Sequence, residues 1–96
     1  MGTSAAQRNA LDKINAVRNN WFRRFREDYP NAAADQQRPS EWVSIYALTT
    51  NHKVQWRTIR ALVRAGLVER RAGDASGPEV RIPKESAFYW ETPGGS

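Results

Sequence analysis

The sequence has 96 residues, of which 40% are hydrophobic, enough for one modest core and too few for two. It contains no cysteine, which excludes a disulfide framework and a thiolate metal site. The net charge is +5, and the excess is concentrated in residues 53–84, which hold eight Lys and Arg against three Asp and Glu. We therefore expect a single domain, residues 1–96, with an anionic partner.

The sequence has no feature of a membrane or secreted protein. No apolar run approaches the about 18 residues that a membrane-spanning helix needs. The N-terminal residues MGTSAAQRN lack the apolar stretch of a signal peptide. Because the absence of cysteine also fits a reducing compartment, we expect a cytoplasmic protein without a membrane partner.

Residues 5–29 have the pattern of a long amphipathic helix. Their large apolar side chains recur at spacings of three and four on one arc of the helix: Leu11, Ile14, Val17, Trp21, Phe22, Phe25 and Tyr29. Pro30 ends the helix, because the residue before a proline is disfavoured in helical conformation. Arg18 falls within the apolar arc, so we expect its head to reach water or to pair with a carboxylate. This helix either covers its own core or forms a dimer interface.

Residues 30–39 begin and end with proline and hold no large apolar side chain, which predicts a loop. Ser40 is a natural N-cap for a short helix over residues 41–49. The expected buried face of that helix consists of Trp42, Ile45, Tyr46 and Thr49. Residues 50–52 form a polar turn in which Thr50 or Asn51 caps the next helix. Two short helices joined in this way predict a helix-turn-helix over residues 40–66.

The second short helix begins at Lys53 and has two unlike faces. At about 100° per residue, four of its cations fall within roughly 60° of one another. We call this set the basic ridge: Lys53, Arg57, Arg60 and Arg64. Ile59, Leu62 and Val63 project to the other side and are expected to enter the core. Gly66 supplies the left-handed residue that commonly ends a helix.

Beyond Gly66, the extended runs 67–72 and 79–83 flank a tip rich in Gly, Asp, Ser and Pro, which predicts a β-hairpin over residues 67–83. The C-terminal residues 84–96 contain Phe88, Tyr89 and Trp90, three aromatic side chains that are costly to leave in water. We expect them to pack on the core, on the long helix or on a second subunit.

A helix, the tripeptide Gly66-Leu67-Val68 and a basic strand together resemble the third helix and first wing strand of winged helix-turn-helix DNA-binding domains, such as MarR-type and GntR-type regulators. The resemblance covers about residues 40–83. Family members commonly carry a leucine four residues before the glycine and an aliphatic residue seven before it, where Leu62 and Ile59 stand. It implies a mostly α-helical α+β fold with a long N-terminal helix, two short helices and a two-stranded wing.

The basic ridge suits double-stranded DNA. Arg57 and Arg60 are placed to reach base edges, where an arginine fork pairs bidentately with guanine. Lys53 begins the same ridge. Arg64 lies a turn further along, where a phosphate contact is more typical.

Other candidate contacts flank the ridge. Gln55 projects toward the core side and reads adenine only if the helix is rolled. Trp56 borders the ridge, where packing is favoured over stacking on nucleic acid. The resemblance adds three wing residues as candidate phosphate or minor-groove contacts: Arg70, Arg71 and Arg81.

The sequence offers little for catalysis. His52 is the one histidine, and in a polar turn a surface or capping role is far commoner than that of a general base. Glu27 and Asp28 form an acidic pair without a second cluster, which is a weak metal signal. We expect no enzyme activity, no cofactor and no small-molecule ligand.

Two functional hypotheses follow. The first is a small sequence-specific DNA-binding protein, a transcriptional regulator of bacterial, plasmid or phage type, that forms a homodimer through the N-terminal helix, the C-terminal aromatic residues or both. The alternative is a protein–protein interaction module that keeps the winged scaffold and binds through the long helix and the aromatic tail.

Overall fold

In the computed structural model, the described residues are 3–29, 41–73 and 77–91, and they form three helices and a three-stranded antiparallel sheet. In chain order the elements are α1 (Ala5–Asp28), β1 (Val43–Ser44), α2 (Ile45–Asn51), α3 (Trp56–Arg64), β2 (Glu69–Arg71) and β3 (Glu79–Arg81). The predicted mixed α+β class is therefore confirmed. The loop predicted over residues 30–39, the cap predicted at Ser40, part of the hairpin tip and the last five residues lie outside the described residues.

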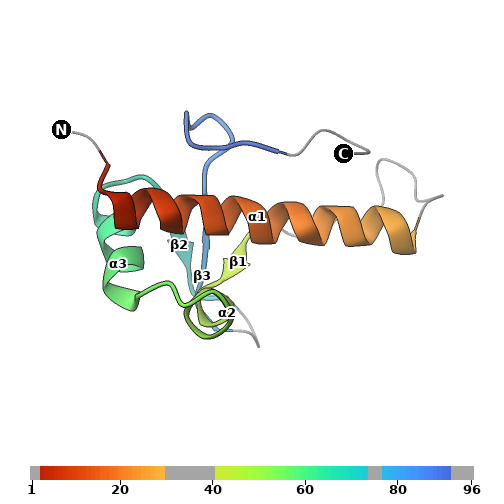
Figure 1. Ribbon diagram of the computed structural model, residues 1–96, viewed down its shortest axis with the longest axis horizontal. Coiled ribbons are helices and arrows are strands. Elements are labelled where there is room, and N and C mark those ends of the chain that lie inside the picture. The colour runs from red at the N-terminus through yellow and green to blue at the C-terminus, as the bar shows by residue number, and fades with distance from the viewer. Residues whose placement is uncertain (1–2, 30–40, 74–76, 92–96) are drawn as a thin grey trace.

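The long N-terminal helix begins and ends close to its predicted bounds. Ser4 and Gln7 form a capping box: the Ser4 Oγ accepts from the Gln7 backbone N–H at 3.1 Å, and the Gln7 Oε1 accepts from the Ser4 N–H at 3.0 Å. The buried residues of α1 end at Phe22, and Tyr29 just beyond the helix is 61% exposed. α2, α3 and the sheet lie on one side of α1 in Figure 1, so its last turns extend past the core.

The sheet contains one strand that the sequence pattern did not predict. β3 lies in the middle and pairs antiparallel with β1 and β2, with Val43 opposite Val80. Residues 43–44 were expected in a helix starting at residue 41, but α2 starts at Ile45, and the Ser44 Oγ caps it by accepting from the Ala47 N–H at 3.3 Å. The buried residues of α2 are Ile45 and Leu48, and Tyr46, expected in the core, is 70% exposed.

The connection between α2 and α3 also differs from the prediction. The expected caps Thr50 and Asn51 belong to α2, and α3 begins at Trp56 with Gln55 as its N-cap. Lys53 has a φ of 55°, in the left-handed region, so it is not helical and joins the basic ridge from the turn. The reason is tertiary: Val54 is buried, and its N–H donates to the Leu48 carbonyl oxygen at 3.0 Å.

The end of α3 follows the prediction for a glycine cap. Gly66 has a φ of 75°. Its N–H donates to the Val63 carbonyl oxygen, and the Leu67 N–H donates to the Leu62 carbonyl oxygen, each at 3.0 Å. These two bonds are those of a Schellman motif. Ile59 and Leu62 are fully buried as expected, so the opposite side of α3 faces outward.

The C-terminal segment, residues 84–91, is tied to α1 by buried polar side chains. Asn15 donates from Nδ2 to the Phe88 carbonyl oxygen at 2.9 Å and accepts from the Trp90 N–H at 3.3 Å. The Arg18 Nη2 donates to the Trp90 carbonyl oxygen. In Figure 1 this segment lies on the side of α1 away from α2 and α3. Phe88 and Tyr89 pack against the core, whereas the side chain of Trp90 remains exposed.

Arg18 reaches neither water nor a carboxylate partner among the described residues, which corrects the expectation from its position. It is 1% exposed, and its guanidinium carbon lies 3.9 Å from the centre of the Tyr89 ring. Burial lowers the pKa of Arg18 and raises the pKa of Tyr89. A carbonyl oxygen and an aromatic face therefore replace the predicted ion pair.

We predict that Asn15→Ala lowers the free energy of unfolding by about 1–3 kcal/mol, because it leaves buried backbone groups of the C-terminal segment without their partner. Urea denaturation measures this loss, with Asn20→Ala as the control. Asn20 accepts only an exposed hydrogen bond from Arg23, so its removal is expected to change stability by less than about 0.5 kcal/mol. Equal effects of the two substitutions would contradict the proposed anchoring role of Asn15.

Candidate nucleic-acid interface

The cations of residues 53–84 divide into two groups on different surfaces. Five of them have no ion-pair partner among residues 3–29, 41–73 and 77–91, and we call this group the basic face: Lys53, Arg57, Arg60, Arg64 and Arg70. All five are exposed. The remaining three, Arg71, Arg81 and Lys84, form ion pairs with glutamates on another surface. The unpaired positive charge of residues 53–84 therefore lies on one surface of the protein.

The basic face is centred on α3. Arg57, Arg60 and Arg64 lie together on the outward side of this helix. Arg60 and Arg64 also line a groove of about 510 Å³ between α3 and β2, where Arg70 joins them from the strand. α3 and β2, which the Gly66 turn connects, thus bring three arginines to one groove.

The floor of this groove is apolar. Its uncharged lining residues come from the start of α2 and from α3: Ile45, Trp56, Ile59 and Val63. Trp56, expected to be a packing residue, is 42% exposed and does not belong to the core formed by the described residues. Gln55, expected to point toward the core, is exposed, because it precedes the helix rather than continuing it. Both residues therefore lie beside the basic face.

Arg71 and Arg81 lie on the outer face of the sheet and not in the groove. The Arg71 Nε is 2.8 Å from the Glu79 Oε1, and the Arg81 Nε is 3.1 Å from the Glu69 Oε1. Strand register explains these pairs, because Arg71 lies opposite Glu79 and Arg81 lies opposite Glu69. Their charges are thus largely balanced by neighbouring carboxylates.

Trp42 supports this arrangement and was not identified from the sequence as a site residue. The guanidinium carbons of Arg71 and Arg81 lie 4.5 and 4.8 Å from the centre of its ring. Glu41 adds ion pairs to Arg81 at 3.7 Å and to Lys84 at 3.2 Å. We call this group the outer sheet cluster: Trp42, Arg71, Arg81, Lys84, Glu41, Glu69 and Glu79.

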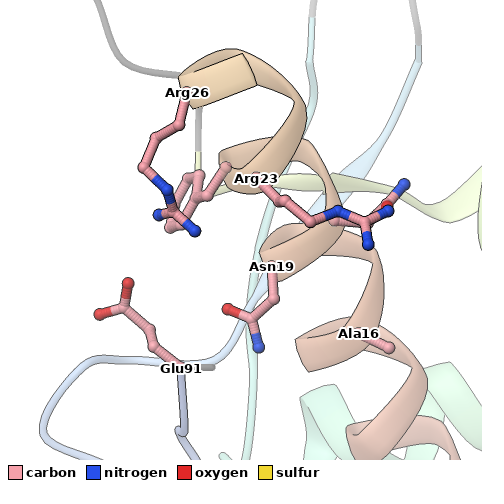
Figure 2. A pocket seen from close by; sticks show the side chains of 7 residues that line it. Ala16, Asn19, Arg23, Arg26 and Glu91 are labelled. Atoms are coloured by element: carbon pink, nitrogen blue, oxygen red, sulfur yellow. The ribbon is translucent and has the colours of Figure 1, made fainter. Parts of the chain in front are cut away.

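A second hollow, of about 210 Å³, lies between α1 and the C-terminal segment, and Figure 2 shows it at close range. Arg23 and Arg26 come from α1, and Glu91 lies on the other side of the hollow, facing Arg26. Arg23 has partners of its own, Asn20 at 2.6 Å and Glu27 at 3.9 Å. With a carboxylate in the hollow, this surface is less suited to an anion than the basic face.

We predict that Trp42→Ala lowers the free energy of unfolding by about 1–3 kcal/mol, since it removes two cation–π contacts and buried aromatic area. Trp90→Ala is the matched control, because its indole is 45% exposed. Thermal denaturation of both variants measures the difference. A Trp42→Ala variant no less stable than Trp90→Ala would show that the outer sheet cluster does not stabilise the fold.

Comparisons with known proteins do not assign a family. No protein-family model matches the chain, and no curated protein and no solved structure matches it. Within the described part of the chain, no helix is long and apolar enough to cross a membrane, and no group of His, Cys, Asp and Glu could hold a metal ion.

Proposed function

We propose that this protein binds double-stranded DNA in a sequence-specific manner through α3 and β2, as a small transcriptional regulator. The observation that carries the proposal is the division of charge within residues 53–84: the cations of this segment without ion pairs among the described residues lie on the α3 side, and the ion-paired ones lie on the outer face of the sheet. A one-sided cationic surface centred on a helix suits the phosphates flanking a major groove.

In this proposal the residues of the basic face have different tasks. Arg57 and Arg60, on the outward side of α3, reach base edges and pair bidentately with guanine. Arg64, at the end of α3, and Arg70, on β2, hold phosphates and position the protein. Lys53 approaches the backbone from the turn before the helix.

The arrangement of elements supports a winged helix-turn-helix as the scaffold of this interface. α2 and α3 follow one another through a short turn, as in a helix-turn-helix. β2 and β3 form the antiparallel pair that corresponds to the predicted wing, and β1 extends it to three strands. Arg71 and Arg81, candidate phosphate contacts from the family resemblance, would have to give up their ion pairs with Glu79 and Glu69 to serve that role.

The alternative, a protein-binding module that uses the long helix and the aromatic tail, gains less support from the tail. Phe88 and Tyr89 pack against the protein's own core, and Asn15 holds the backbone on both sides of Tyr89. Phe88 and Tyr89, two of the three aromatic side chains that suggested a binding surface, thus make much of their contact inside the protein.

We predict that titration with a random duplex pool at low salt gives binding tighter than about 100 µM, the weak end of non-specific binding. On an enriched duplex, Arg57→Ala is expected to cost roughly 1–3 kcal/mol and to reduce discrimination among sequences. Arg70→Ala should weaken binding to every sequence and lower the slope of log K against log salt by about one. Fluorescence anisotropy at several salt concentrations measures both effects.

Arg71→Ala is the matched comparison for Arg70→Ala, because the two arginines are neighbours on the same strand. Since Arg71 is paired with Glu79, its removal should change the salt slope by clearly less than one. If no duplex binds in the stated range, the proposed function is wrong. If Arg71→Ala changes the slope more than Arg70→Ala does, the outer face of the sheet is the interface.

We also propose that the protein acts as a homodimer through α1. The helix is about 36 Å long, and its buried residues end at Phe22. Phe25 and Tyr29 stack at 5.1 Å between ring centres beyond that point, and Tyr29 is 61% exposed. A second copy covering this end would give a dimer with two α3 helices, as the reading of two half-sites on one duplex requires.

We predict that sedimentation equilibrium gives about twice the monomer mass of 10.9 kDa at tens of micromolar protein. Tyr29→Glu should shift the equilibrium toward monomer without changing the far-UV circular dichroism, because a charge would be buried in the interface. Arg8→Glu, an exposed change near the opposite end of α1, is the control. A monomer mass for the unmodified protein would rule out this dimer.

A further inference from the structure

Trp56 is an aromatic side chain beside the proposed reading surface. It is the first residue of α3, it is 42% exposed, and it lines the groove between α3 and β2 together with Ile59 and Val63. Burial of its ring in the protein's own core therefore does not account for a tryptophan at this position. Its exposed apolar area, beside cations at the start of a helix, is therefore open to contact with a partner.

The rim of the groove indicates what that partner is. Arg60, Arg64 and Arg70 line the groove together with apolar side chains, so the occupant combines negative charge with an apolar group. In duplex DNA the phosphates supply the charge, and the one apolar group exposed at a base edge in the major groove is the 5-methyl group of thymine. Trp56 is also well placed along the helix, because the N-terminal residues of a recognition helix approach base edges.

We propose that the groove between α3 and β2 receives a thymine methyl group and that Trp56 is a specificity-determining residue for it. The inference rests on the proposed DNA binding and adds a base preference to it. Arg64 and Arg70 hold the DNA phosphates beside the groove. The methyl group lies against the indole ring, where water is excluded from both apolar surfaces.

Gln55 extends the same preference to the neighbouring position. It is the N-cap of α3, but its side chain makes no capping hydrogen bond, and it is exposed. A glutamine amide pairs bidentately with N6 and N7 of adenine. The start of α3 is thus suited to A·T pairs, whereas Arg57, further along the helix, is suited to guanine.

The experiment uses the full-length protein and a duplex enriched from a random pool. Each thymine of the enriched site is replaced in turn by deoxyuridine, which removes the methyl group and leaves base pairing intact. We expect one or two positions at which the dissociation constant rises about fourfold, the value for one buried methyl-sized group. Trp56→Ala should bind thymine and deoxyuridine duplexes equally at those positions, whereas Trp56→Phe, which keeps an apolar ring, should retain part of the difference.

Arg57→Ala is the control for general loss of affinity: it should weaken binding to both duplexes and leave the fourfold ratio unchanged. Circular dichroism melting shows whether each variant is folded. Enriched sites without a shared thymine, no sensitive position, or equal sensitivity in Trp56→Ala would each overturn the role of Trp56 while DNA binding stands. Tighter binding to single strands than to duplex would also overturn it, in favour of base stacking in the groove. Absence of any duplex binding would refute the proposed function itself.

Discussion

The pairing of carboxylates with arginines on the outer face of the sheet is the interaction on which the one-sided charge of residues 53–84 depends. Glu69 and Glu79 each lie opposite an arginine of the neighbouring strand, and Trp42 lies against both guanidinium groups. Without these pairs, the cations of the β2–β3 hairpin would form a diffuse positive surface. With them, the cations of residues 53–84 that have no ion-pair partner among the described residues are those of α3, the turn before it and Arg70.

The second constraint is the position of α3, which three features fix. The buried Val54 sets its start, the Schellman bonds around Gly66 set its end, and Ile59 and Leu62 set its rotation by entering the core. Because rotation is fixed, Arg57, Arg60 and Arg64 must face outward. The same α3–Gly66–β2 connection brings Arg70 beside Arg60 and Arg64. Local caps and core packing thereby determine the shape of the groove.

Much of this arrangement follows from local patterns in the sequence. The period of α1, the glycine at the end of α3 and the burial of Ile59 and Leu62 were all predictable, because each depends on residues close together along the chain. The two-residue strand β1 was not, since it is too short to show an alternating pattern and its residues also fit a helical spacing. The start of α3 was missed because the left-handed conformation of Lys53 depends on burial of Val54.

The candidate site was predictable in composition but not in geometry. The separation of Arg70 from Arg71 and Arg81 follows from the alternation of side chains along strands, and Glu69 and Glu79 were available in the sequence as partners. The register that places Glu69 and Glu79 opposite their arginines could be seen only in the structure. The exposure of Trp56 and Gln55 depended on the start of α3, and the carbonyl partner of Arg18 depended on the path of the C-terminal segment.

The most direct test of a one-sided interface uses the four tryptophans as reporters, because they lie in different parts of the fold: Trp21 on α1, Trp42 in the outer sheet cluster, Trp56 in the groove and Trp90 in the C-terminal segment. Titration of ¹⁵N-labelled protein with a duplex should shift the indole N–H signal of Trp56 and the backbone amides of α3 and β2. The indole signals of Trp21, Trp42 and Trp90 should stay nearly unchanged. Large shifts of Trp21 or Trp90 with an unperturbed Trp56 would contradict the assignment of the basic face as the DNA-binding surface.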